Sequence, residues 1–201
     1  MTPGNFYHVF NHANGAENLF KETKNYYFFL NKVSEHILPF VKLHAYCLLP
    51  NHFHFVIYAR EFQEIKSLPL FKLYQNLSEE EFQLLIEKKI SKSFSNLFSS
   101  YTQSFNKTYQ RKGSLFMPNM KCNIIEDNNS ICKVIHYVHT NPLHHGFVKR
   151  PEEWKFSSYN SYLSDLVTKL SKKEVIDIFG SKEYFLEYHR QPVELKIAWD
   201  K

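Results

Sequence analysis

Cysteine is scarce in this chain, and the few present are not spaced as metal-binding or disulfide-forming pairs. The 201 residues include three cysteines, Cys47, Cys122 and Cys132, and none of them belongs to a Cys-x-x-Cys pair. An odd count without such a pair is not the pattern of a disulfide framework or a zinc ribbon. We therefore expect reduced thiols, as in a cytosolic protein.

Long apolar runs are also missing. No window approaches the roughly 18 uncharged apolar residues that a membrane-spanning helix requires. The N-terminal stretch MTPGNFYHVFNH has no basic segment followed by an apolar one, so it does not have the pattern of a signal peptide. These absences predict a cytoplasmic protein without a membrane partner.

Several catalytic signatures are absent as well. The sequence contains no Walker lysine loop, no GxGxxG, no GxSxG and no HExxH. Their absence argues against the common P-loop, dinucleotide-binding, α/β-hydrolase and zincin patterns.

The residues that are present suit one folded domain with a small appendage. Hydrophobic residues make up 43% of the chain and aromatic residues 17%, which is enough to bury a core. The formal net charge is +5. This mild basic bias is compatible with a nucleic-acid partner but does not establish one.

Hydrophobic periodicity predicts a β-α-β-β-α-β-α order followed by a tail. Strands are expected at 6–10, 41–49, 52–58, from 115 onward and at 122–125. Helices are expected at 24–37, at 93–107, from 131 to a stop at Pro142, and as two short segments separated by Gly180. An antiparallel sheet packed on one side by helices accommodates this order.

Two segments are harder to assign. Residues 59–90 predict one or two short helices leading into a longer one, with Ser78 as an N-cap before three glutamates. Residues 147–162 are expected to be irregular.

The stretch LLPNHFHFVIY, residues 48–58, combines an apolar strand with two histidines. Because side chains alternate along a strand, His52 and His54 share one face, opposite the phenylalanines. Neutral imidazole is a common ligand of divalent metals, and this spacing lets two rings converge on one ion. Two histidines on a solvated or half-buried sheet face are the commoner explanation of an isolated pair. A metal site would need a third ligand.

The expected helix VIHYVHTNP offers a candidate. Tyr137 and Asn141 are four residues apart, so they project from neighbouring turns on the same side. An amide oxygen is a reasonable hard ligand beside two imidazoles. A phenol oxygen can act as a nucleophile where a metal polarises its target. A half-buried tyrosine and a helix-terminal asparagine without a chemical role remain the alternative.

Between Lys88 and Ile125 the sequence has basic residues but no Asp or Glu. The basic residues are Lys88, Lys89, Lys92, Lys107, Arg111, Lys112 and Lys121. Aromatic residues are interleaved with them, and such a pattern can neutralise phosphates and stack on unpaired bases. A solvated basic face, with several of the aromatic residues in the core, would give the same pattern.

Three other histidines are less informative. His144 and His145 follow Pro142 and are expected to be a surface pair rather than ligands. His44 precedes the His-x-His pair by one strand, and its face relative to that pair depends on a strand register that the sequence leaves open.

Four segments together resemble the single-tyrosine HUH transposases. AYCLLPNHFHFVIY resembles their HUH segment, in which U is a bulky apolar residue, here Phe53. YTQSFNK followed by RKGSLF is similar to their central stretch, YVHTNPLHHGFV to their catalytic helix and EEWKFSSYNSY to the segment after it. The resemblance runs in order from about Phe6 to Tyr162. It is nearest to the REP-associated tyrosine transposases, in which the third ligand looks like Asn.

This resemblance implies an α+β protein with a ferredoxin-like (RRM-like) antiparallel sheet, helices on one face and the HUH strand at its centre. It implies an HUH transposase domain at 1–162. Residues 59–90 depart from the family pattern as an expected insertion, and residues 163–201, which lie beyond the match, are expected to form a C-terminal helical extension. The extension would aid DNA binding or cover the active site.

Roles transfer only to matching positions. His52 and His54 would bind Mg or Mn, and Asn141 would complete the protein ligands. Tyr137 would be the nucleophile that cleaves and rejoins single-stranded DNA through a 5′-phosphotyrosine. The residues expected to contact the DNA are Lys107, Arg111, Lys112 and Lys121.

The expected partner is single-stranded or hairpin DNA, and both a homodimer and a monomer remain open. Two other functions stay open at this point. One is a nucleic-acid-binding module of the same fold that has lost cleavage. The other is a metal-dependent phosphoesterase that uses water, in which Tyr137 only orients the substrate.

Overall fold

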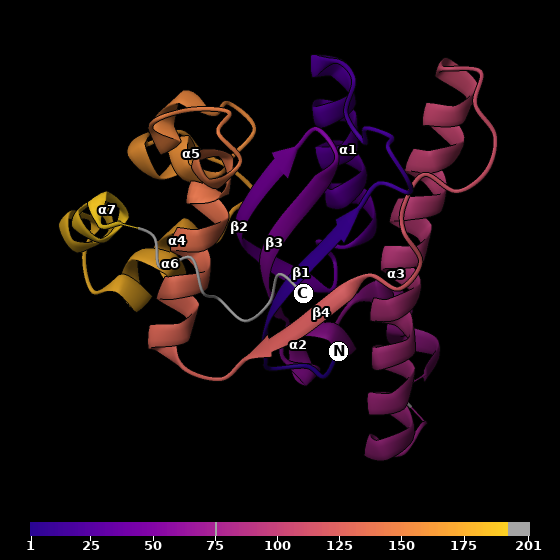
Figure 1. Ribbon diagram of the computed structural model, residues 1–201. Coiled ribbons are helices and arrows are strands. Elements are labelled where there is room, and N and C mark those ends of the chain that lie inside the picture. The colour runs from indigo at the N-terminus through magenta and orange to yellow at the C-terminus, as the bar shows by residue number, and fades with distance from the viewer. Residues whose placement is uncertain (75, 193–201) are drawn as a thin grey trace.

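The computed structural model describes residues 1–74 and 76–192, which are built around one antiparallel sheet (Figure 1). Its strands are β1 (Phe6–His12), β2 (Val41–Leu49), β3 (His52–Ala59) and β4 (Lys121–Ile125). Their order across the sheet is β2-β3-β1-β4, with every neighbouring pair antiparallel. The expected α+β, ferredoxin-like sheet is confirmed, and the strand carrying His52 and His54 is one of its two central strands.

The helical segments follow the predicted order. They are α1 (Thr23–His36), α2 (Phe62–Lys66), η1 (Pro69–Tyr74), α3 (Glu79–Thr108), α4 (Asn128–His144), η2 (Pro151–Glu153), α5 (Tyr159–Leu163), α6 (Lys172–Phe179) and α7 (Lys182–Arg190). Ser78 is the N-cap of α3, as expected: its hydroxyl accepts the backbone N–H of Glu81, whose carboxylate accepts the N–H of Ser78. From that cap α3 continues without a break through the helix expected at 93–107.

The expectation that Pro142 ends its helix is wrong. Asp127 caps the start of α4 by accepting the N–H of Ser130 at 2.9 Å, but the helix continues through Pro142 to His144. A proline in the last turn removes only one helical hydrogen bond, so the turn can still close. The N–H of His145 donates to the carbonyl of Asn141, and Gly146 adopts a φ of 69° beyond the end.

Two other local expectations need correction. No strand of the described sheet begins at residue 115; the chain there makes only an isolated bridge between Phe116 and Ala13 before β4 begins. The segment 147–162 is not wholly irregular either, because it contains η2 and the start of α5.

One face of the sheet packs against α1 and α3. Phe53 and Phe55 of β3 are fully buried on this face, and the Phe29 ring of α1 lies 5.4 Å from that of Phe53. Complete burial of one such side chain stabilises a fold by about 1.5–3 kcal/mol. This core holds β3 rigidly from one side.

Helices cover the opposite face as well, which corrects the expectation of helices on one face only. There α4 packs on the small side chains of β2 and β3, including Ala45, Cys47 and Val56. A register irregularity near His44 brings Ala45 and Cys47 onto this face. The outer side of α4 is in turn covered by α6 and α7, so this helix is buried on nearly all sides.

The tail belongs to this second layer. Glu174 of α6 accepts hydrogen bonds from Lys42 and His44 of β2, and Phe179 and Phe185 pack in the same core as α4. The division into 1–162 and 163–201 stays a prediction, and residues 193–201 of the predicted extension lie outside the described residues. The predicted insertion at 59–90 ends inside α3.

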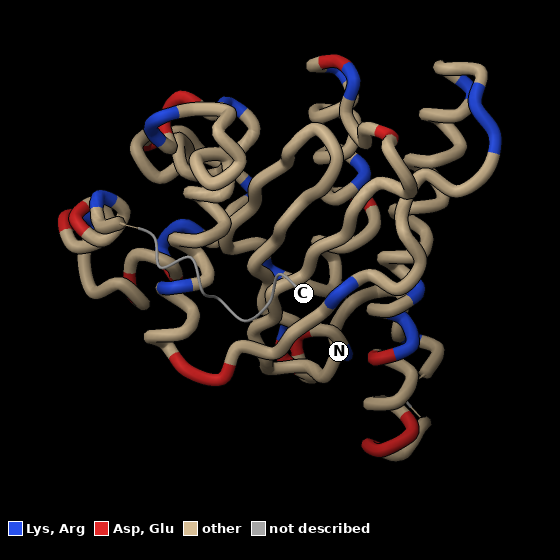
Figure 2. Tube along the Cα trace, in the orientation of Figure 1, with Lys and Arg blue, Asp and Glu red and all other residues tan. Residues whose placement is uncertain are grey.

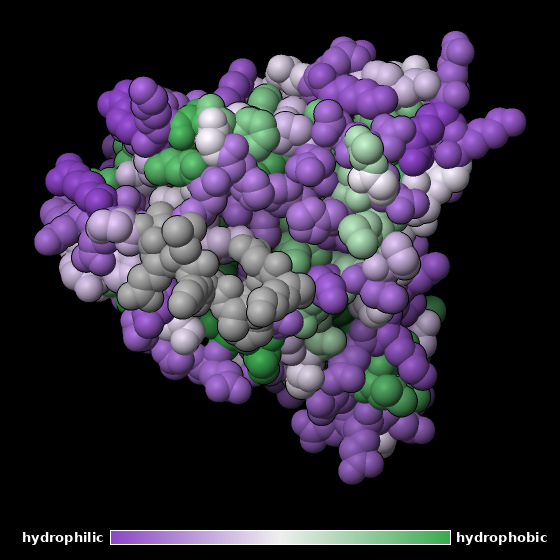
Figure 3. Space-filling view, viewed as in Figure 1, coloured by the Kyte–Doolittle hydropathy of each residue, from purple (hydrophilic) through white to green (hydrophobic). Residues whose placement is uncertain are grey.

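The face of the molecule drawn in Figure 3 shows no broad apolar band. The face in Figure 3 is mostly hydrophilic, with separate hydrophobic areas. Within residues 1–74 and 76–192, no helix combines the length and the hydrophobicity that crossing a membrane would demand.

Candidate active site

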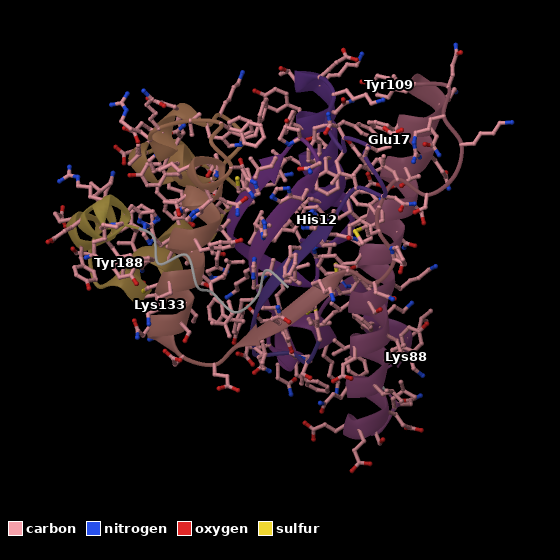
Figure 4. All side chains as sticks on the ribbon, in the orientation of Figure 1. His12, Glu17, Lys88, Tyr109, Lys133 and Tyr188 are labelled. Atoms are coloured by element: carbon pink, nitrogen blue, oxygen red, sulfur yellow. The ribbon has the colours of Figure 1, made fainter. Side chains whose placement is uncertain are left out.

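Strand register brings histidines of β1 and β3 together beneath α4. His12 lies opposite His52 across the two strands, and their stacked rings are 4.7 Å apart. His8 shares this face because it is four residues from His12 along the same strand. Figure 4 labels His12, which lies near the middle of the sheet. The two predicted histidines are therefore part of a group of four imidazoles.

His52 has a defined orientation. Its Nδ1–H donates to the side-chain oxygen of Asn51 at 2.7 Å, which leaves the lone pair of a neutral ring on Nε2. That Nε2 lies 3.2 Å from the side-chain oxygen of Asn141 on α4. The structure thus brings together two of the predicted ligands, which are 89 residues apart in sequence.

His54 is buried beside a partner that the sequence analysis missed. Its Nδ1 lies 3.0 Å from Nε2 of His8, so these imidazoles share a hydrogen bond. Burial, followed by the neighbouring His8, holds the pKa of His54 well below its usual range. When Nδ1 of His54 donates, its Nε2 carries the lone pair, the state in which a histidine binds a metal.

Tyr137 packs directly on this histidine group. Its ring is nearly perpendicular to that of His54, with centroids 5.5 Å apart, and lies 6.0 Å from the ring of His8. Tyr137 and Asn141 project from the same side of α4, as their four-residue spacing predicts. Tyr137 is only 6% exposed, so a ligand would reach it through the cavity that opens onto these residues.

A cavity of about 350 Å³ opens onto these residues. Its lining includes His52, His54 and Tyr137 together with residues that follow α3 and precede β4. Asn141 is 1% exposed and does not line this cavity, but its side-chain oxygen contacts His52. Lys121, the first residue of β4, is exposed and lines the cavity, so one of the predicted DNA contacts does lie at the candidate site.

The donor set fits a divalent cation in one respect. Ligands about 2.1 Å from an octahedral ion lie about 3 Å apart, close to the separation of the His52 nitrogen and the Asn141 oxygen. Both atoms offer lone pairs to a cation when Nδ1 of His52 carries the ring proton, whereas the two atoms form a hydrogen bond when Nε2 carries it. Among the described residues, no three His, Cys, Asp or Glu side chains form a ready-made metal cluster. A site here would depend on imidazoles and an amide.

The pair His144–His145 lies closer to the site than the sequence suggested. The exposed His145 has its ring 4.8 Å from that of His52 and lines the cavity. The ring of His144 lies 5.8 Å from that of Tyr137. By contrast, His44 is hydrogen-bonded to Glu174 at 3.0 Å at the other end of the face, so it is a structural residue.

The other predicted DNA contacts lie away from the cavity, at and just beyond the end of α3 (Figure 2). Lys107 and Lys112 are exposed there. Arg111 has protein partners: its guanidinium bonds Glu17 at 3.2 Å and the carbonyl of Ser114 at 2.7 Å. The hydrogen bond from Arg111 lowers the pKa of Glu17.

Comparison with known proteins adds one finding. No family model and no curated protein sequence matches this chain. A solved structure of a REP-associated tyrosine transposase bound to a REP hairpin is similar, with a TM-score of 0.50 over 83% of this chain and 84% of that one. The sequences are 15% identical. The chain therefore shares its fold with that structure.

A second group of histidines is buried between α4 and α7. The N–H of His189 donates to the carbonyl of Phe185 at 2.7 Å, and its other nitrogen lies 2.8 Å from Nδ1 of His139. The remaining nitrogen of His139 lies 2.7 Å from the hydroxyl of Ser158. Every contact in this chain of hydrogen bonds is satisfied when both rings are neutral.

This arrangement predicts a loss of stability in acid. The pKa of His189 is lowered to about 3: burial is the largest cause, the hydrogen bond to the Phe185 carbonyl opposes it, and the imidazole of His136 adds to the lowering. His139 and Tyr159 also face the ring. Below about pH 6.5 the unfolded chain binds a proton that the folded chain rejects until about pH 3. Within that window the free energy of unfolding should fall with decreasing pH, by up to about 1.4 kcal/mol per unit for this group.

Urea unfolding between pH 7 and pH 4.5 measures this effect. A His189→Gln protein should show a smaller pH dependence than the native protein, although it is less stable at pH 7. His145→Gln, at an exposed position, is the matched substitution and should follow the native curve. If the free energy of unfolding depends on pH equally in the native and His189→Gln proteins, His189 is not the cause of the loss of stability in acid.

Proposed function

We propose that this protein cleaves and rejoins single-stranded DNA, with Tyr137 as the nucleophile. The observation that carries the proposal is the convergence of Tyr137, His52 and His54 on one cavity, with Asn141 in contact with His52. These residues come from two separate elements, β3 and α4. The likeness in fold to a transposase that is bound to a REP hairpin supports DNA with a hairpin as the substrate class.

The chemical step uses the phenol oxygen of Tyr137. That oxygen attacks the phosphorus, forms a 5′-phosphotyrosine bond and loses its proton, while the bond from phosphorus to the 3′ oxygen breaks and that oxygen gains a proton. The energy of the phosphodiester is kept in the new bond, so attack by a 3′-OH rejoins strands without a nucleotide cofactor. Release of the DNA from Tyr137 restores the phenol.

His52, His54 and Asn141 would hold a divalent metal, Mg or Mn. When bound, such an ion supplies Lewis-acid stabilisation of charge on the phosphate oxygens. The surrounding residues have other tasks: Asn51 and His8 orient the two imidazoles, and Lys121 neutralises the phosphate entering the cavity. Lys107 and Lys112 are exposed beyond the cavity and would contact more distant phosphates. Arg111 would contact DNA from its position beside Glu17.

A covalent-trapping experiment tests the function directly. Labelled hairpin DNA with single-stranded flanks is incubated with the native protein and Mn²⁺, and the products are separated on a denaturing gel. We expect a labelled protein–DNA adduct and a released fragment with a free 3′-OH. Cleavage without an adduct would favour a hydrolase that uses water. Binding without cleavage in Mg²⁺ or Mn²⁺ would favour the nucleic-acid-binding module.

His8 provides a separate test of how the metal ligands are oriented. We expect His8→Phe to weaken Mn²⁺ binding about 10–100-fold, because the hydrogen bond that orients His54 is lost. Calorimetric titration of the protein with Mn²⁺, without DNA, measures this effect. His8→Gln retains a hydrogen-bonding side chain and should recover part of the affinity. Native affinity in His8→Phe would contradict the positioning role.

A further inference from the structure

A groove next to the candidate site lies between α3 and the segment that leads into β4. It has a volume of about 700 Å³, which is within the range of about 300–1,000 Å³ typical of ligand pockets. One wall is a stripe along α3, formed by Ser91, Ser95, Ser99, Thr102 and Gln103. These residues recur every three or four positions, so they share one face of the helix.

This groove adjoins the cavity that Tyr137 lines. Asn11, Met117, Pro118 and Asn119 line both spaces. The junction is held in place by hydrogen bonds: the Asn11 amide donates to the carbonyl of Met117 at 3.2 Å, and the N–H of Met117 donates to the carbonyl of His12 at 2.9 Å. A strand whose phosphate reaches Tyr137 can therefore continue into the groove.

The lining of the groove suits nucleobases better than phosphates. No Lys, Arg, Asp or Glu is among its lining residues. Hydroxyl and amide groups both donate and accept hydrogen bonds, which matches the mixed edges of unpaired bases. Phe98 and Met117 offer apolar surface, and Met117 is 49% exposed.

Positive charge lies beside this neutral lining rather than within it. Lys88 and Lys92 precede Ser95 and Ser99 by seven residues each, so they extend the same face of α3 toward its N-terminus. Both lysines are exposed, and Figure 4 labels Lys88 on this helix. Lys121 lies in the adjoining cavity. Phosphates can thus be bound at the edges while bases enter the groove.

We propose that this groove binds unpaired bases of the DNA strand adjacent to the scissile phosphate and sets the base preference of the protein. The inference rests on the proposed function for its substrate class. Ser95, Ser99, Thr102 and Gln103 contact base edges, whereas Lys88 and Lys92 contact the backbone. The groove thereby selects which phosphate is presented to Tyr137.

Two neighbouring polar residues of α3 give a matched test. Ser95 and Asn96 are both exposed on this helix, but only Ser95 lines the groove. We expect Ser95→Phe, which fills the groove, to weaken binding of a fluorescent single-stranded DNA of about 12 nucleotides roughly tenfold. Asn96→Phe adds the same ring outside the groove and should bind as the native protein does. Fluorescence anisotropy without metal measures both, and equal affinities for the two variants would overturn the proposal.

Base preference and salt dependence separate the two kinds of contact. We expect Thr102→Val with Gln103→Met to change the sequences selected from a randomised single-stranded pool while leaving the salt dependence of binding unchanged. Lys88→Ala and Lys92→Ala should each lower the salt slope by about one, with the same sequences selected. Gln83→Met, an exposed change outside the groove on α3, is the control. Unchanged selection in the Thr102–Gln103 variant would contradict base reading.

The outcomes distinguish this proposal from the proposed function. If Ser95→Phe binds and selects DNA as the native protein does, while the native protein forms the Tyr137 adduct, only the groove proposal fails. If Ser95→Phe weakens binding but the native protein forms no adduct, the groove proposal stands and the cleavage proposal fails.

Discussion

Replacement of Tyr137 with phenylalanine should abolish the covalent protein–DNA adduct and lower strand cleavage about 10⁴-fold or more, because phenylalanine has no oxygen to attack the phosphate. Adduct formation and cleavage should be lost, whereas folding and DNA binding should be kept. Tyr137 packs with its ring against His54 and His8, and phenylalanine retains that ring. Denaturing gels of labelled hairpin DNA measure the adduct, and anisotropy measures binding, which should stay within about twofold of native.

Tyr7→Phe is the control for this experiment. Tyr7 is also a buried tyrosine, but its ring belongs to the core on the opposite side of the sheet and its hydroxyl contacts Thr2. Its variant should form the adduct at the native rate. An adduct of normal yield in Tyr137→Phe would show that another residue is the nucleophile.

Removal of either central histidine should abolish metal binding almost completely. For His52→Ala and for His54→Ala we expect the affinity for Mn²⁺ to fall more than about 100-fold, a larger loss than that expected for an orienting neighbour such as His8. The loss of an imidazole leaves one nitrogen and one amide oxygen, too few protein ligands to hold the ion well. Calorimetric titration without DNA gives the affinity independently of cleavage.

His44→Ala is the control for the loss of fold stability that follows from removing any buried histidine. His44 is fully buried on β2 and bonded to Glu174, so its loss should destabilise the fold without changing Mn²⁺ affinity. Thermal melts of all three variants show whether each is folded during the titration. Native Mn²⁺ affinity in a folded His52→Ala protein would exclude His52 as a ligand and with it the proposed metal site.

Metal binding and DNA cleavage should also respond together. Chelation of divalent ions should eliminate cleavage by the native protein and leave binding of the single-stranded probe intact, because Lys121 and the groove lie beside the predicted metal ligands rather than among them. Cleavage at the native rate in the presence of a chelator would contradict a metal-dependent mechanism.

Local patterns determined the parts of the site that lie on single elements. Alternation along a strand placed His52 and His54 on one face, and the helical repeat placed Tyr137 and Asn141 on one side. The cap at Ser78 was also predicted, because an N-cap depends on residues a few positions away. The resemblance to a known family connected these two local patterns before any contact between them was known.

Other parts of the site depend on pairing between distant segments. His8 and His12 lie on the same face of the first strand, and their spacing is visible in the sequence. That spacing alone did not predict a site, because only the register with β3 places them beside His54 and His52. The packing of α4 across that face required the small side chains of β2 and β3 beneath it. The groove along α3 likewise exists only because residues 114–120 return beside that helix.

The sequence by itself determined the order of the main elements, the α+β class and which side chains of β3 and α4 share a face. Those properties follow from chain geometry over a few residues, which repeats the same way in any fold. The tertiary structure alone decided that helices cover both faces, that α4 passes through Pro142, and that Tyr137 packs on His8 and His54 of the histidine group. Those outcomes depend on strand register and packing between segments far apart in the chain, which no local pattern encodes.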